Sequence, residues 1–288
     1  MFGRLLKYEL KATSRVIPFA FLISFLFAIF HFLLSRFLGD LAVGASFAFL
    51  VLALVTQFII VWVMLAVRYY KSMYGAEAYL THTLPTSSTS IFWSKFLVAF
   101  GWFFVSVVYI AAMVAGLFAN LMQMLKVNMD ELGGGFEMFL RFLGIPVSGW
   151  GLVLVLLFFA LTVSLGSLIT LYFAVTAGST SVFGSMGMGG PVIMYILVYI
   201  GQQILGIFAG LLIPISLKMN FVEDFANHIL GGVMSWELVF ESTMLSWFSG
   251  NGNAGQLFPL GSYILNPIIY TSMILITVYL VKRKTSLR

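Results

Sequence analysis

The stretch Arg68–Lys95, RYYKSMYGAEAYLTHTLPTSSTSIFWSK, is a polar interruption between two long apolar runs. Only 9% of the chain is charged. Even so, this one stretch holds four charged residues, Arg68, Lys71, Glu77 and Lys95, together with His82. The stretch has none of the spacings of a finished active site. We expect it to be a docking surface that a membrane bundle presents.

The composition predicts a membrane protein. The chain has 288 residues, of which 61% are hydrophobic, with a mean hydropathy of +1.06. A soluble domain is 45–50% apolar and about 25% charged. Runs of about 20 apolar residues recur, and each can cross a ~30 Å hydrocarbon core as a helix. The sequence therefore predicts an all-α polytopic membrane protein with a single transmembrane domain, residues 1–288.

The apolar runs predict six spans. We place them at about 16–37, 41–67, 91–120, 149–175, 192–215 and 263–281. The segment 68–95 is then a loop between the second and third spans. Pro85 and the serines that follow it provide the start of the third span. Two mixed segments, 131–143 and 221–248, are expected to form short interfacial or re-entrant helices on the outer face.

Residues 1–15 have helical periodicity. Basic side chains share one face of this helix, at Arg4, Lys7, Lys11 and Arg15. That pattern predicts an amphipathic helix lying on an anionic leaflet. Glu9 falls on the apolar face, where it either snorkels to water or pairs with another part of the protein. Both alternatives remain open at this point.

Basic residues predict the orientation. With both termini and the 68–95 loop on one side, that side holds 11 of the 15 Lys and Arg residues and the other holds 4. The positive-inside rule makes the richer side cytoplasmic. No soluble basic face exists for nucleic acid.

Motifs for catalysis are missing from the sequence. There is no G-x-x-x-x-G-K-[ST] phosphate loop, no H-E-x-x-H metal pair and no G-x-S-x-G elbow. The chain also has no cysteine. We therefore predict no catalytic or metal site and no cofactor in this chain, and we do not expect an enzyme.

A few polar side chains lie within the predicted spans, and the main ones are His31, Gln57, Gln202 and Gln203. His31 is expected to be a hydrogen-bonded packing residue rather than a metal ligand. Spans so rich in Phe and poor in charge favour an amphiphilic or apolar substrate taken from the membrane. We expect it to be handled near His31, Gln57 and Gln202.

The loop motif resembles a known family. Tyr74–Pro85, YGAEAYLTHTLP, followed by Ser94-Lys95, is similar to the pattern Y-G-x-E-G-Y-L-T-x-T-L-P…S-K of type-2 ABC exporter permeases from Gram-positive bacteria. Ala78 replaces the commoner glycine. The opening LKYELK of Leu6–Lys11 also resembles the N-terminal helix of that family.

The resemblance implies a multi-pass subunit of the bacterial plasma membrane with both termini cytoplasmic. Two such permeases, identical or related, would pair among membrane lipids and dock two ABC ATPase subunits, which carry ATP and Mg²⁺. The residues implied in docking and coupling are Glu9, Tyr74, Glu77, Tyr79, His82 and Leu84. A short helix closed by Thr83-Leu84-Pro85 is expected to present Tyr74, Glu77 and Tyr79 to the ATPase, with Glu77 facing a basic residue.

Two other classes remain open. The chain could be a non-transporting immunity, sensor or assembly protein that binds a partner through the 68–95 loop, and a channel is the third class. Substrate-stimulated ATP hydrolysis with a partner ATPase distinguishes the exporter from both.

Overall fold

The computed structural model describes residues 2–37, 40–75, 77–83, 85–124, 149–180, 183–220, 235–240, 257–259 and 261–283. Six helices in this part of the chain are long and apolar enough to cross a membrane. They are α2 (Ile17–Phe37), α3 (Asp40–Met73), α5 (Ser88–Met124), α7 (Gly149–Gly178), α8 (Gly189–Leu212) and α10 (Gly261–Arg283). The six predicted spans are confirmed, and the protein is an all-α polytopic membrane protein.

The chain divides into two compact units. The first comprises residues 1–124, 157–195 and 274–288, and the second comprises 125–156 and 196–273. The first unit also contains the short helices α1 (Phe2–Thr13) and α4 (Ala78–His82) and the 3-10 turn η1 (Gly184–Met186). Because α1, α4 and the 68–95 stretch all belong to the first unit, the predicted docking residues can be compared within one body.

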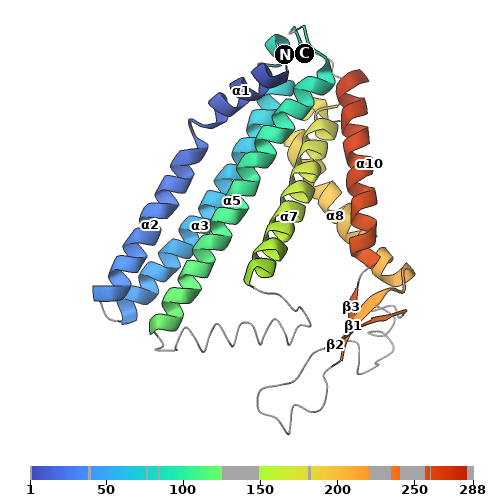
Figure 1. Ribbon diagram of the computed structural model, residues 1–288. Coiled ribbons are helices and arrows are strands. Elements are labelled where there is room, and N and C mark those ends of the chain that lie inside the picture. The colour runs from blue at the N-terminus through green and yellow to red at the C-terminus, as the bar shows by residue number, and fades with distance from the viewer. Residues whose placement is uncertain are drawn as a thin grey trace. The chain divides into compact units, whose positions relative to one another are not determined.

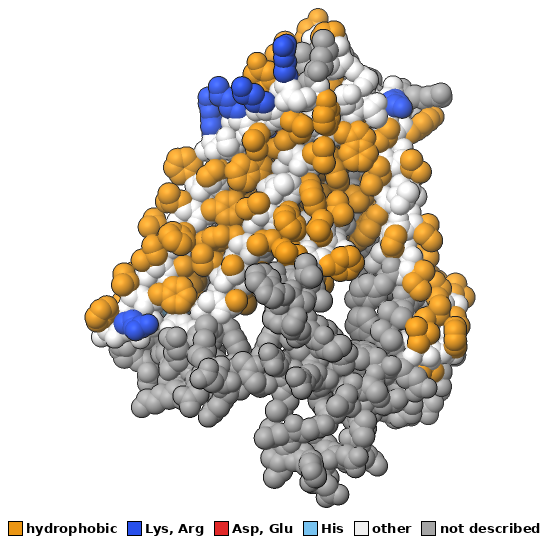
Figure 2. All heavy atoms as spheres, in the orientation of Figure 1, with side chains coloured by type: hydrophobic (Ala, Val, Ile, Leu, Met, Phe, Trp, Pro, Cys, Tyr) orange, Lys and Arg blue, Asp and Glu red, His pale blue; other side chains and the backbone are white. Residues whose placement is uncertain are grey.

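In the first unit, α2, α3 and α5 run side by side (Figure 1). Their shared core contains Ala28 of α2, Leu50 and Leu54 of α3, and Leu117 of α5. Buried hydroxyl groups in these helices are hydrogen-bonded, as when Ser24 Oγ donates to Phe21 O of its own helix at 2.9 Å. The outward faces carry many exposed Phe, Leu and Ile side chains. Figure 2 shows these apolar surfaces, with basic side chains gathered near α1, as expected of spans that face lipid.

Both flanks of the predicted 68–95 loop are helical. α3 continues to Met73, and α5 begins at Ser88. The extension of α3 is buried, since Tyr69 and Ser72 are each 1% exposed. The buried hydroxyl of Ser72 donates a hydrogen bond to Tyr69 O at 3.2 Å. At the start of α5, the Ser90 amide donates to Ser87 Oγ at 3.3 Å, which confirms the serine-rich helix start. The connection between the helices is therefore shorter than the sequence predicts, and it lies within residues 74–87.

The second unit contains a small sheet of three strands, β1 (Ser216–Asn220), β2 (Ser235–Val239) and β3 (Leu257–Pro259). Their order is β2-β1-β3, and both pairs are antiparallel, with Lys218 opposite Glu237 in one pair and Leu257 in the other. The expectation of short helices over 221–248 is therefore wrong for Ser235–Val239, where strand pairing provides the backbone hydrogen bonds. The rest of 221–248, apart from residue 240, and all of 131–143 lie outside the described residues.

Candidate functional site

The N-terminal helix and the loop motif meet at one end of the first unit. α1 packs against α5, and α4 packs against α3. Thr13 fixes the end of α1, because its Oγ1 donates to Glu9 O at 2.9 Å and accepts from Trp102 Nε1 at 2.8 Å. Two segments that are separated by about 65 residues in the sequence are thus anchored to two neighbouring spans, α1 to α5 and α4 to α3.

α4 is the short helix that the sequence predicts in the loop. Glu77 precedes it with helical backbone angles, and Thr83 follows it. Two threonines tie the turn together: Thr81 Oγ1 donates to Glu77 O, and Thr83 Oγ1 donates to Leu80 O, both at 3.0 Å. These local bonds allow a five-residue helix to form in a segment with little core of its own.

Gly75 lets the chain turn sharply between α3 and α4. A Cβ atom at this position would lie 2.9 Å from Lys71 Cα and 3.1 Å from Lys71 O. The Gly75 amide meanwhile donates to Tyr70 O at 3.0 Å, so the backbone cannot move away without losing this bond. The glycine in the Tyr74-Gly75 pair is therefore required by close backbone packing.

We expect Gly75→Ala to destabilise the first unit by about 1–3 kcal/mol and to displace α4, because overpacking against backbone has no flexible side chain to absorb it. Unfolding by SDS titration in mixed micelles measures the change. Gly101→Ala on α5 is the matched control, since a Cβ there meets nothing within 4 Å. Equal stability of the two variants would contradict the packing argument.

Four charged side chains form one network across α1, α3, α4 and α5. Glu9 pairs with Lys95 through Oε1 and with Arg68 Nε through Oε2, the latter at 3.5 Å. Arg68 also donates from Nη1 to Glu77 Oε2 at 3.3 Å. The ion-pair alternative for Glu9 is confirmed, and the network joins the N-terminal helix to the loop through Arg68.

Burial differs strongly along this network. The side chain of Lys95 is 6% exposed and that of Glu9 is 14% exposed, whereas Arg68 is 34% and Glu77 49% exposed. A buried charge that loses its partner is far more destabilising than an exposed one. We therefore infer that the Glu9–Lys95 pair holds α1 against α5. The more exposed Arg68–Glu77 pair contributes little to the stability of the fold.

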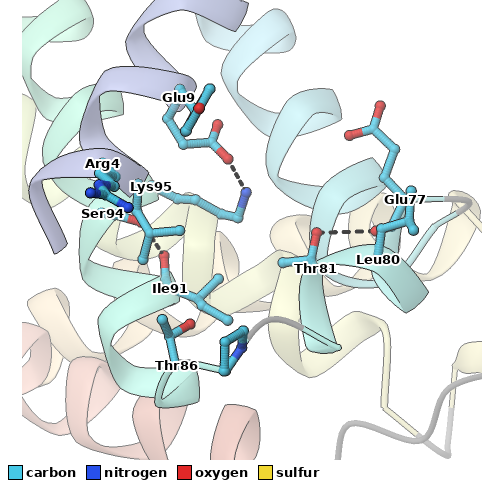
Figure 3. A pocket seen from close by; sticks show the side chains of 12 residues that line it. Arg4, Glu9, Glu77, Leu80, Thr81, Thr86, Ile91, Ser94 and Lys95 are labelled. Carbon is cyan, nitrogen blue, oxygen red and sulfur yellow. Dashed lines mark hydrogen bonds and ion pairs between the residues drawn. The ribbon is translucent and has the colours of Figure 1, made fainter. Parts of the chain in front are cut away.

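A groove with a volume of about 690 Å³ opens between α1 and α4. Figure 3 shows the carboxylate of Glu9 pointing to the ammonium of Lys95 within it. Its lining comes from α1 (Arg4, Leu5, Tyr8, Glu9), from α4 and its cap (Glu77, Leu80, Thr81) and from the start of α5 and the residues before it (Pro85, Thr86, Ile91, Ser94, Lys95). We call this the α1–α4 groove. It combines apolar walls with both signs of charge, a composition suited to a protein partner.

The predicted loop residues separate into anchors and exposed groups. Tyr79 is 66% exposed and Leu80 is 69% exposed, so both are available to a partner. Tyr74 is turned inward, because its ring packs edge-on against Tyr69 at 6.2 Å and its hydroxyl is buried. Burial raises the pKa of Tyr74 to about 12, so the phenol stays neutral at physiological pH.

Two expectations about the loop change in consequence, and those for His82 and Leu84 stay predictions. Tyr74 holds the turn in place and is not presented outward, because its phenol belongs to the aromatic packing beneath the loop. The basic residue that faces Glu77 is Arg68 of the same chain. His82 ends α4, its side chain is outside the described part, and Leu84 lies outside the described residues.

Two of the residues expected along a substrate path, His31 and Gln57, have hydrogen-bond partners of their own within the first unit. His31 Nδ1 lies 3.0 Å from Ser46 Oγ, and its Nε2 lies 3.2 Å from Asn120 Nδ2. This confirms His31 as a hydrogen-bonded packing residue that ties α2 to α3 and α5. Gln57 Nε2 donates to Ser106 Oγ. Gln57 and Ser46, the partner of His31, are eleven residues apart on α3, which is about 16 Å along the helix axis.

Gln202, the third residue of the expected path, belongs to the second unit. Its Nε2 donates to Met273 Sδ at 3.6 Å. His31 and Gln57 belong to the first unit, and each has hydrogen-bond partners of its own there. His31 and Gln57 are therefore separate packing groups within the first unit, and the expected substrate path stays a prediction.

Arg68 and Lys95 are site residues whose roles sequence reasoning missed. Both belong to the stretch that the sequence predicts as a docking surface, but neither is predicted from the sequence to be a partner of Glu9. The sequence feature that points to these roles is Glu9, because an acid on an apolar helix face needs a basic partner that is itself shielded from water.

The chain matches no protein-family model, no curated protein and no solved structure. The fold and the site therefore define its class by themselves. It is a multi-pass α-helical membrane protein whose N-terminal helix and loop helix α4 are joined by ion pairs beside an open groove.

Proposed function

We propose that the chain is the membrane-spanning permease subunit of an ATP-driven ABC exporter. In this proposal it moves an amphiphilic or apolar substrate, such as a peptide, lipid or drug-like molecule, out of a bacterial cell. A separate ABC ATPase hydrolyses ATP and binds the face that carries α1 and α4. A second permease, identical or related, completes the assembly.

The observation that supports this proposal is the connection of Glu9, Arg68 and Glu77. An exporter permease must convert movement of an ATPase on its surface into movement of its spans. Here the exposed side chains of α4 lie on a helix that Arg68 links, through Glu9, to both α1 and Lys95 of α5. A push on α4 would therefore act on three helices together, two of which, α3 and α5, are spans.

The docking surface in this proposal consists of Glu77, Tyr79 and Leu80 beside the α1–α4 groove. Exposed aromatic and aliphatic side chains next to a groove are typical anchors of protein interfaces. Tyr79 and Leu80 have more than half of their surfaces free. A helical or loop segment of the ATPase that fills the groove would desolvate Glu77 as well.

Co-expression with an ABC ATPase encoded beside the gene tests the class. We expect a stable complex whose ATP hydrolysis rises when an amphiphilic substrate is added to proteoliposomes. A complex that forms but shows no substrate-stimulated hydrolysis would favour the non-transporting class. No complex with such an ATPase would remove the support for an exporter.

The proposal places α4 in the cytoplasm and the α2–α3 connection outside. Because the chain has no native cysteine, single cysteines report the two sides cleanly. Phe37→Cys and Leu80→Cys are suitable, since these side chains are 82% and 69% exposed. A membrane-impermeant maleimide added to intact cells should label position 37 and leave position 80 unlabelled until the cells are opened. The reverse pattern would invert the topology and place the proposed docking surface on the wrong side.

A further inference from the structure

A second groove, separate from the α1–α4 groove, lies between α2 and α3 along their membrane-facing surfaces. Its volume is about 180 Å³, and its walls include Ile23 and Phe27 of α2 and Phe49, Leu52 and Ile60 of α3. These five apolar side chains are between 37% and 62% exposed, so the groove opens toward the lipid. None of the described residues that line it is charged.

Gln57 forms part of the wall of this groove and is 2% exposed. Its Nε2 donates to Ser106 Oγ at 3.0 Å. Its Oε1 is buried and has no hydrogen-bond partner among the described residues. An unpaired carbonyl in hydrocarbon loses the hydrogen bonds that water would give it, so this oxygen is a strong site for a donor.

The position of Gln57 limits the kind of donor. The apolar part of α3 runs over Gly44–Met73, so Gln57 lies near its middle, far from either membrane surface. The groove extends over residues 49–60 of α3, about 16 Å along the helix. A groove of this length, with no charged residue among its described walls and with one polar group at mid-depth, accommodates a hydrocarbon chain better than a charged headgroup.

We infer that this groove binds an uncharged single-chain amphiphile from the membrane, with its hydroxyl group bonded to the Gln57 carboxamide and its chain lying along Phe27 and Phe49. A hydroxyl can donate or accept, and it therefore pairs with either orientation of the amide. The terminal torsion of Gln is soft, so the amide turns toward the ligand while its stem stays packed. The exposed Thr56 hydroxyl lies in the same wall and provides a second polar contact.

This inference concerns binding alone and does not depend on the proposed exporter function. A complex with an ATPase could fail to form while the groove still binds its ligand, and the reverse also holds. The two therefore fail independently, in different experiments.

The test uses a photoactivatable long-chain alcohol with a diazirine in its chain, and a matched alkane probe without the hydroxyl. The full-length protein in phosphatidylcholine nanodiscs is irradiated with each probe, and the adducts are mapped by mass spectrometry. We expect the alcohol to label residues 20–27 and 49–60 about fivefold more than the alkane, the effect of one net hydrogen bond. Excess unlabelled hexadecanol should suppress this labelling.

Gln57→Leu should reduce alcohol labelling to the level of the alkane, whereas Gln202→Leu, the same change outside this groove, should not. Ala53→Phe fills the groove without removing a polar group and should block both probes there. Folding of each variant is judged by its size-exclusion profile and thermal unfolding. If Gln57→Leu does not fold, the labelling of Ala53→Phe alone tests whether the groove binds the probes. Equal labelling by both probes, or unchanged labelling in Ala53→Phe, overturns the inference. Crosslinking of this face to a second copy of the chain would overturn it too, and would assign the groove to a subunit interface.

Discussion

Glu9→Ala is expected to destabilise the first unit by about 3 kcal/mol, the largest effect on folding that we predict for a single change. It leaves the ammonium of Lys95, 6% exposed, without its carboxylate partner. Removing one member of a buried ion pair is destabilising by about 3–5 kcal/mol because the remaining charge is poorly solvated. Snorkelling of the long lysine stem toward the membrane surface reduces this penalty, so we place the effect at the lower end. SDS-titrated unfolding in mixed micelles measures it.

Two variants show whether the effect comes from the unpaired charge. Lys7→Ala changes an exposed residue of the same helix and should alter stability by less than about 0.5 kcal/mol. The double variant Glu9→Leu with Lys95→Met removes both charges and keeps apolar volume, so it should recover most of the lost stability. If Glu9→Ala unfolds like the unchanged protein, Glu9 is a snorkelling side chain and α1 is held by packing alone.

The second large effect is expected on partner binding. Under the proposed function, Glu77→Lys should weaken ATPase binding more than tenfold while leaving the bundle folded. The Arg68–Glu77 pair is partly exposed, and such pairs contribute about 0.2–1 kcal/mol to folding. The same carboxylate covered by a partner loses its water, and breaking a desolvated interfacial pair costs about 2–5 kcal/mol. Co-purification and ATPase assays on the variant measure the loss.

Arg68→Gln distinguishes the two roles of Glu77. This change removes the in-chain partner of Glu77 while keeping its carboxylate. If Glu77 acts through Arg68 alone, Arg68→Gln should impair binding as much as Glu77→Lys does. If Glu77 contacts the ATPase directly, as we propose, Arg68→Gln should impair binding less. Full binding and coupling in Glu77→Lys would falsify the role of this carboxylate in docking.

The spans and the loop helix could be predicted from the sequence because their signals are local. Twenty apolar residues in a row specify a membrane helix regardless of its neighbours, and all six spans were found this way. Glu9 marked the site because an acid on an apolar face is costly without a partner. The identity of that partner could not be predicted, since Lys95 is 86 residues away in the sequence and only packing of α1 on α5 brings the two together.

The sheet of the second unit was missed although its signal was present. Residues 216–220, SLKMN, and 235–238, SWEL, both alternate polar and apolar side chains, which is the period of a strand. The mixture of acids and apolar residues over 221–248 predicts interfacial helices instead. The direction of Tyr74 could not be predicted either, because its neighbour Tyr69 lies on the part of α3 that the sequence assigned to the loop.

The central claim is that the exposed face of α4 is the docking surface for an ATPase. The most direct measurement is the affinity of the purified ATPase for the chain in nanodiscs, with Tyr79→Ala and Leu80→Ala combined. These side chains are 66% and 69% exposed, so their removal should leave the fold intact. Phe37→Ala is the matched control, because Phe37 is an 82% exposed aromatic that ends α2. We predict binding at least tenfold weaker for the α4 variant and unchanged for Phe37→Ala. Equal affinity of the α4 variant and the unchanged chain would contradict the account.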